Sequence, residues 1–125
     1  MEDDWDLEDW LLEAGEAAEK KHLGGDELSP IEILTRELWV FDMHSVNGGV
    51  SQYFGNYSER WPAFVAAVSK LHIEPLQLLV KRIEVIIGDS DDPYSALCEV
   101  SDLDNDYYAN RLSIWRDVQA LANAA

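Results

Sequence analysis

Asn47-Gly48-Gly49-Val50-Ser51-Gln52-Tyr53-Phe54-Gly55-Asn56 stands near the centre of this chain and marks its sharpest expected turn. The two adjacent glycines allow backbone angles that other residues resist. We therefore expect a corner between two helices, with Asn47 capping the second helix through its side-chain oxygen. Two interpretations stay open: a corner that holds a satisfied polar cluster, or a binding site built from the same residues.

The helix before this corner has a strong start signal at Ser29-Pro30-Ile31-Glu32. Ser29 suits the N-cap, Pro30 the first helical position, and Glu32 completes a capping box. Apolar residues then recur at helical spacing to about His44, at Ile31, Leu34, Leu38 and Phe41. A strand over residues 38–41 is the competing interpretation, and the capping box favours the helix.

Three further helices are expected after the corner. Ser58 is the expected cap of a helix that runs through Trp61 to Leu71, with Pro62 in its first turn. A break at residues 72–75 precedes a largely buried helix over residues 76–87, which Gly88 ends. A short strand over residues 84–87 is the alternative there. Asp104 is the expected cap of the last helix, whose inward side chains would be Tyr108, Leu112, Trp115 and Val118.

The first 27 residues predict a separate acidic helix over residues 3–22, which Gly24-Gly25 ends. Trp5, Trp10 and Leu11 offer apolar area for docking, while Gly15 weakens the helix by roughly 1 kcal/mol relative to Ala. We predict an all-α, compact single-domain bundle of about five to seven helices. Its parts would be the acidic N-terminal helix, residues 1–27, and a helical core domain, residues 28–125, with an acidic loop at 88–106.

The formal net charge of −16 is concentrated in two segments of the chain. Residues 1–27 carry a net −9 and residues 88–106 a net −7, so the rest of the chain is neutral. Such charge repels nucleic acid and anionic lipid and attracts basic surfaces. The residues that we expect to meet a basic partner are Glu2, Asp3, Asp4, Asp6, Glu8, Asp9, Glu13, Asp89, Asp91, Asp92, Asp102 and Asp104.

Several functional classes lack support in the sequence. The single Cys98 suits a reducing cytoplasm, and no stretch approaches the ~20 apolar residues of a membrane span. Asp102, Asp104 and Asp106 match the first ligand positions of a calcium-binding loop. The pattern then fails, because Tyr107 stands where such a loop requires Gly. The histidines lack zinc-site spacing. We expect a cytoplasmic protein that has no cofactor and is not an enzyme.

The central stretch also resembles a known family. Asn-Gly-Gly, two spacer residues, Gln-Tyr-Phe and a second Asn are similar to the signature of a small bacterial family named after its DNA-mimic member. The residues that carry this resemblance are Asn47, Gly48, Gly49, Gln52, Tyr53, Phe54 and Asn56, and the later run 103–108 resembles another family segment. His44 departs from the family pattern, which usually has Glu there. The resemblance spans roughly residues 38–118 and omits the first acidic segment.

This resemblance implies a protein that occupies the surface of a nucleic-acid-binding protein. Together with the charge, it predicts a DNA-mimic-like protein, monomeric or homodimeric, that binds a basic DNA- or RNA-binding protein rather than nucleic acid or membrane. Two alternatives stay open: an immunity or antitoxin-type protein that blocks a basic toxin, and a small-ligand binder that uses residues 47–56 with His44. The DNA-mimic hypothesis expects the two acidic segments to form one continuous negative strip.

Overall fold

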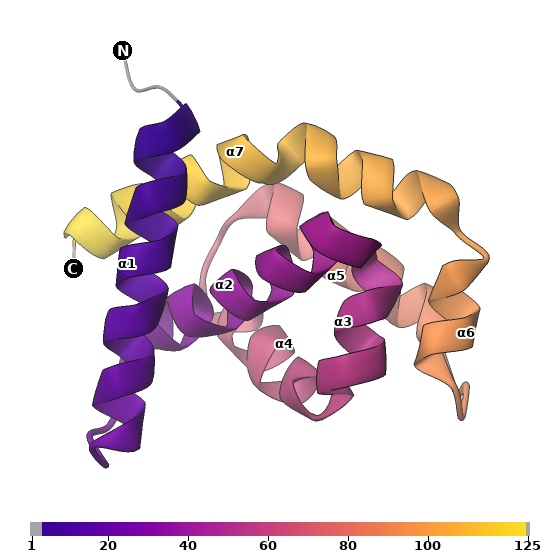
Figure 1. Cartoon of the computed structure of the whole chain (residues 1–125), viewed down its shortest axis with the longest axis horizontal. Helices are drawn as coiled ribbons and strands as arrows, with labels where there is room; N and C mark the ends of the chain where they lie inside the picture. The colour runs from indigo at the N-terminus through magenta and orange to yellow at the C-terminus, as the bar shows by residue number, and fades with distance from the viewer. Residues whose placement is uncertain (1–3, 125) are drawn as a thin grey trace.

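The computed structural model describes residues 4–124, apart from the side chains of Asp4, Trp5 and Ser101. The described chain is all helical (Figure 1), as predicted. None of its helices has the length and apolar character needed to cross a membrane. The helices are α1 (Asp4–Leu23), α2 (Pro30–Gly48), α3 (Val50–Tyr57), α4 (Trp61–Lys70), α5 (Glu74–Ile87), α6 (Pro93–Cys98) and α7 (Ser101–Ala124), with a 3-10 turn, η1 (Ser58–Arg60), before α4.

Helix α2 is the centre of the bundle and packs against α1, α3, α4 and α7. It begins as predicted: the Ser29 side chain accepts from the Glu32 backbone N–H, and the Glu32 carboxylate accepts from the Ser29 N–H. Phe41 lies at the middle of its buried face. The rings of Tyr53, Phe64 and Tyr107 surround Phe41 edge-on, at centroid distances of 5.1, 5.1 and 5.2 Å. The aromatic core therefore joins α2, α3, α4 and α7.

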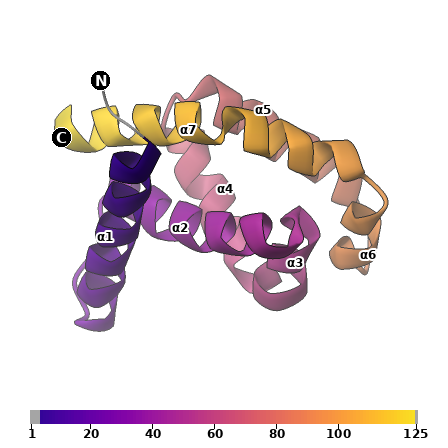
Figure 2. The ribbon, with the colours of Figure 1, turned by 45° about the horizontal axis from the view of Figure 1, so that its top comes forward.

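The other helices wrap around α2 (Figures 1 and 2). Helix α6 packs on α3 and α5 at one end of the molecule, and α7 runs back from there, beside α5, to α1 at the other end. Both competing strand interpretations are wrong, because residues 38–41 and 84–87 are helical. The predicted Ser58 cap is also wrong: Ser58 lies within η1, and α4 begins without a side-chain cap.

Helix α7 starts three residues earlier than its predicted cap, and the tyrosine that it buries also differs from the prediction. Asp104 lies in its first turn, and Tyr107 is buried where Tyr108 was expected to be. Tyr108 is 60% exposed. Inside the expected acidic loop, where a short helical turn anchored by Tyr94, Leu97 and Val100 is predicted, lies α6, which Asp92 caps.

Helix α1 is docked on the bundle through one narrow face. Leu7, Leu11 and Ala18 are buried there, against α2 and α7. Gly15 lies between them: a Cβ at this position would lie 2.6 Å from Cγ of Trp39 on α2. The glycine that weakens α1 as an isolated helix therefore allows its backbone to approach the Trp39 ring.

Replacing Gly15 with Ala should destabilise the protein. Helix propensity alone predicts a gain of about 1 kcal/mol, whereas overpacking against Trp39 costs about 1–3 kcal/mol, which leaves a net loss of up to about 2 kcal/mol. Urea unfolding followed by circular dichroism, with limited proteolysis of α1, measures the sign. Ala17→Gly on the exposed side of α1 is the control and should cost only the propensity difference. A more stable Gly15→Ala variant would contradict the tight approach of α1 to α2.

Candidate partner-binding surface

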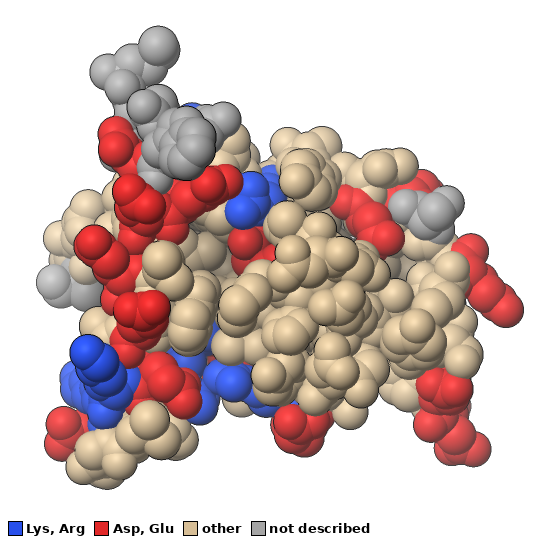
Figure 3. Space-filling view, viewed as in Figure 1, with Lys and Arg blue, Asp and Glu red and all other residues tan. Residues whose placement is uncertain are grey.

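The outer side of α1 carries one row of carboxylates, here called the α1 carboxylate row. Its members are exposed and spaced by three or four residues, so they share one stripe of the helix: Asp6, Asp9, Glu13 and Glu16. The docked residues of α1 lie on the opposite side. Figure 3 shows the acidic side chains as a column along α1, at one end of the molecule. The row spans about 15 Å, at ~1.5 Å per residue.

Two other carboxylates of α1 flank the docked face and hold the helix in place. Glu8 accepts a hydrogen bond from Arg111 Nη1 of α7 at 3.2 Å, and Glu19 pairs with Arg36 of α2. Glu8, expected to meet a partner, thus has an internal contact as well. Of the other expected residues, Glu2 and Asp3 lie outside the described residues, and the side chain of Asp4 is not described.

Behind α1, a buried polar network joins α2 and α7, and Arg111 links it to Glu8 of α1. Asp42 of α2 accepts from Arg111 Nε at 2.7 Å and Nη2 at 3.1 Å, and from the Tyr107 hydroxyl. Arg111 also lies 4.0 Å above the centroid of the Trp115 ring. Burial and the Asp42 carboxylate raise the pKa of Tyr107, so its hydroxyl remains a donor. The sequence pattern missed this network; its only local sign was an acid on the apolar face of a helix.

The acids of the second segment serve several structural roles. Asp92 caps α6, because its Oδ1 accepts from the Ser95 N–H at 3.2 Å. Arg82 of α5 pairs with Asp102 at 2.8 Å and also with Asp106. Two residues from the expected set, Asp89 and Asp91, are exposed and have no hydrogen-bond or ion-pair partner among residues 4–124.

Asp104 caps a helix other than its own. Its Oδ1 accepts from the Val50 N–H at 2.8 Å, at the start of α3. The predicted cap, Asn47, is wrong, because Asn47 still lies in α2 and Gly49 occupies the N-cap position without a side-chain bond. The acceptor thus comes from 54 residues away along the chain. Gly49 suits this corner, since its φ is +87° and the Asp104 carboxylate lies directly beside it.

The two acidic segments do not form one continuous strip. In Figures 1 and 3 the α1 carboxylate row lies at one end of the longest axis, and α6 with the start of α7 lies at the other. The surface between them in this view is largely uncharged. On the face drawn in Figure 3, the continuous strip expected from the sequence is therefore replaced by two separate acidic surfaces.

The residues of the central motif are divided between core and surface. Tyr53 and Phe54 are buried in the aromatic core. A Cβ on Gly48 would lie 1.7 Å from Oε1 of Gln52, whose Nε2 is 3.4 Å from Nδ1 of His44. Figure 1 shows the sharp α2–α3 corner that these residues build. The two asparagines of the motif, Asn47 and Asn56, are exposed.

Three surface hollows in the described part of the chain bear on the question of a ligand site. One of about 460 Å³ lies between α5 and α7, and one of about 510 Å³ lies between α1 and α2. The third, of about 530 Å³, is wide open and touches the central motif only at Phe54, Gly55 and Asn56. His44, Asn47 and Gln52 line none of these three hollows, so only the C-terminal end of the expected ligand site, residues 54–56, borders one of them. No three potential metal ligands are grouped within residues 4–124.

The chain matches a known protein family over most of its length. A family model described as DMP19-like protein matches residues 26–123. The matched range includes the central motif and the second acidic segment, and it begins after the end of α1. No curated protein and no solved structure matches the chain.

Replacing Asp104 with Ala should lower the free energy of unfolding by about 1 kcal/mol, the usual cost of a lost N-cap. The reason is that the Val50 N–H would lose its acceptor. Asp102→Ala is the matched control: it removes a carboxylate from the same turn of α7, but one whose ion pair with Arg82 is exposed. Equal destabilisation of the two variants in urea unfolding would contradict a capping role for Asp104.

Acidification should loosen α1. The hydrogen bond from Arg36 lowers the pKa of Glu19 from its ordinary value of 4.5. The hydrogen bond from the Ser29 N–H, and to a smaller extent the one from Lys21, lowers the pKa of Glu32 from the same ordinary value of 4.5. A group whose pKa is lower in the folded state than in the unfolded state stabilises the protein at pH values above its unfolded-state pKa. This stabilisation is lost as the pH falls through its folded-state pKa. Stability should therefore fall below about pH 4.5. The free energy of unfolding, measured at several pH values, should fall less steeply with acidification in Glu19→Gln than in the wild type. Identical pH dependence in the two proteins would refute the contribution of Glu19.

Proposed function

We propose a function from the premise that this chain belongs to the DMP19-like protein family. The protein binds a basic nucleic-acid-binding protein and blocks the site at which that protein binds nucleic acid. The contact would be made by the α1 carboxylate row. The family resemblance supports the general role, and the row supplies the negative surface. One observation carries the proposal: four carboxylates at helical spacing lie on the exposed side of a helix whose other side is docked.

The charge density of the row supports this role. Four carboxylates occupy about 15 Å of helix. One strand of duplex DNA carries a phosphate about every 3.4 Å, which gives roughly four charges over the same length. A protein surface whose Lys and Arg side chains are placed for one strand would therefore meet a similar number of negative groups. The row resembles a single strand, not a duplex.

The docking of α1 also favours binding. A helix already held by buried apolar residues and by the Glu8 and Glu19 ion pairs need not be ordered when the partner arrives. Association therefore avoids part of the entropy cost of fixing a mobile segment. The neutral body beneath adds no competing positive excess, since the net charge lies in the two acidic segments.

The second acidic segment has a smaller part in this proposal. It lies at the far end of the molecule, and Asp92, Asp102 and Asp104 each have internal contacts. Only a partner that spans the long axis would meet both acidic surfaces at once. We therefore assign the primary contact to α1 and an extension of it to Asp89 and Asp91.

Neutralising the row should abolish partner capture. The tagged full-length chain would be used for capture from lysate at low salt, alongside the variant Asp9→Asn, Glu13→Gln, Glu16→Gln. A control variant, Asp89→Asn, Asp91→Asn, Glu99→Gln, makes the same change in charge at the far end. We expect nucleic-acid-binding proteins to be retained by the wild type, retained in a smaller amount by the control, which loses only the extension of the contact, and lost by the α1 variant. Their retention should fall steeply with salt.

Competition with DNA tests the blocking itself. Duplex DNA added to the loaded resin should release the captured protein, because both would occupy the same basic surface. Equal loss of capture in both variants would indicate a general charge effect and would refute a specific row. Capture that DNA does not displace would refute mimicry, and a captured toxin nuclease would place the protein with immunity proteins.

A further inference from the structure

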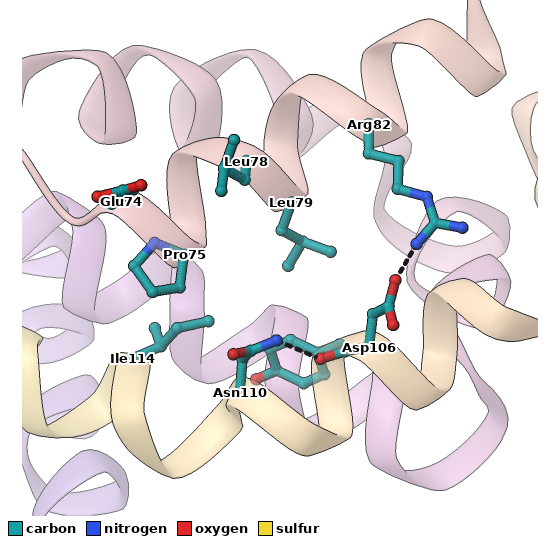
Figure 4. A pocket seen from close by; sticks show the side chains of 9 residues that line it. Glu74, Pro75, Leu78, Leu79, Arg82, Asp106, Asn110 and Ile114 are labelled. Atoms are coloured by element: carbon teal, nitrogen blue, oxygen red, sulfur yellow. Dashed lines mark hydrogen bonds and ion pairs between the residues drawn. The ribbon is translucent and has the colours of Figure 1, made fainter.

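The hollow between α5 and α7 is an open, mainly apolar groove. Its volume is about 460 Å³. Figure 4 shows Leu78 and Leu79 of α5 on one side and Ile114 of α7 on the other. Asn110 lies on the α7 side as well, and its side-chain amide is already bonded to the Asp106 carbonyl. The space is large enough for apolar side chains of a partner.

An exposed apolar row continues this groove along α5. Leu78 is 60% exposed and Val85 is 78% exposed. Seven residues separate them, which is two turns, so both side chains share one face of the helix about 10 Å apart. Single exposed apolar residues are ordinary, but two in line beside an apolar groove form a contiguous apolar surface. A second helix laid along α5 would cover both.

Negative charge lies at both ends of the groove. Glu74 stands at one end and is exposed, and no described residue forms an ion pair with it. At the other end Arg82 faces two carboxylates, Asp102 and Asp106, so this group keeps one net negative charge. Lys81 is exposed on the same helix, but it does not line the groove. The ends of the groove therefore favour a positively charged occupant.

We propose that the groove between α5 and α7 is a second docking surface, which takes a basic amphipathic helix of the partner. This rests on the proposed function, which supplies a basic partner. An apolar side chain of that helix enters between Leu78 and Ile114, and the next turns cover Val85. Lys or Arg residues two to three turns apart reach Glu74 and the carboxylates beside Arg82. Apolar anchors at helical spacing are the usual way in which a helix occupies a groove.

A peptide titration of the full-length chain tests this proposal. The probe is a fluorescein-labelled synthetic helical peptide of about 16 residues, with Leu at helical spacing and Lys elsewhere. The same peptide with Glu in place of Lys serves as the charge control. In NMR spectra of the isotope-labelled protein, the backbone amide signals of Leu78, Asn110 and Ile114 should shift when the Lys peptide is added. They should stay in place when the Glu peptide is added.

Variants separate groove binding from general attraction to an acidic protein. Leu78→Ser with Val85→Ser should weaken binding roughly tenfold, since two apolar contacts are lost. Leu12→Ser is the matched control, because Leu12 is 44% exposed on α1 and lies outside the groove. Its affinity should equal that of the wild type. Shifts confined to α1, or an unchanged affinity of the double variant, would overturn the proposal.

The two proposals can fail separately. In the variant Asp9→Asn, Glu13→Gln, Glu16→Gln, the groove shifts should persist even though the α1 carboxylate row is neutral. Persistence supports the groove whatever happens to partner capture by α1, and disappearance shows that the peptide binds through the row instead. A chain that sediments as a dimer in the wild type and as a monomer in the double variant would assign the groove to self-association and overturn the proposal.

Discussion

The buried carboxylate of Asp42 is the constraint on which the arrangement of the helices depends. A charge taken out of water is costly unless it is paired and its oxygens accept hydrogen bonds. Asp42 meets this requirement only because α7 brings the Tyr107 hydroxyl and the Arg111 guanidinium to α2. Arg111 then reaches Glu8 as well, so the same guanidinium places α1. One buried acid thereby fixes how three helices meet.

This arrangement separates the charges that hold the fold from those that face outward. Carboxylates beside helix contacts, such as Glu8, Glu37 and Glu19, pair with arginines. The carboxylates of the α1 carboxylate row face solvent on the other side of their helix. The proposed partner surface can therefore be strongly acidic while the carboxylates at the helix contacts stay paired with arginines. A solvated row is screened by salt, whereas the buried pairs are screened much less.

Local signals in the sequence predicted the elements of this fold well. The capping box at Ser29 and Glu32 depends on residues three apart, so the sequence reveals it directly. The family was likewise recognised from a short motif whose residues shape one corner. The N-cap of α3 could not be found in this way, because its acceptor, Asp104, lies 54 residues away. A cap that tertiary packing supplies leaves no trace in local spacing.

The charge pattern shows the same limit. The acidic residues of the sequence mark both negative segments. The direction in which α7 crosses the bundle cannot be read from the sequence, and it is this direction that places the two segments at opposite ends of the molecule. The identity of the buried tyrosine was also predicted wrongly. Tyr107 shares one helical stripe with the buried Leu103, Ile114 and Val118, and Tyr108 faces solvent.

The two sides of α1 are open to different amounts of evolutionary change. Its inner side holds Leu7, Leu11 and a glycine that the Trp39 ring leaves no room to enlarge. Its outer side touches solvent, where most substitutions alter stability by no more than about 0.5 kcal/mol. Acids there can be gained, lost or shifted by a turn while the bundle stays intact. The outward surface can thus drift to follow a changing partner, on a scaffold that has little freedom to change.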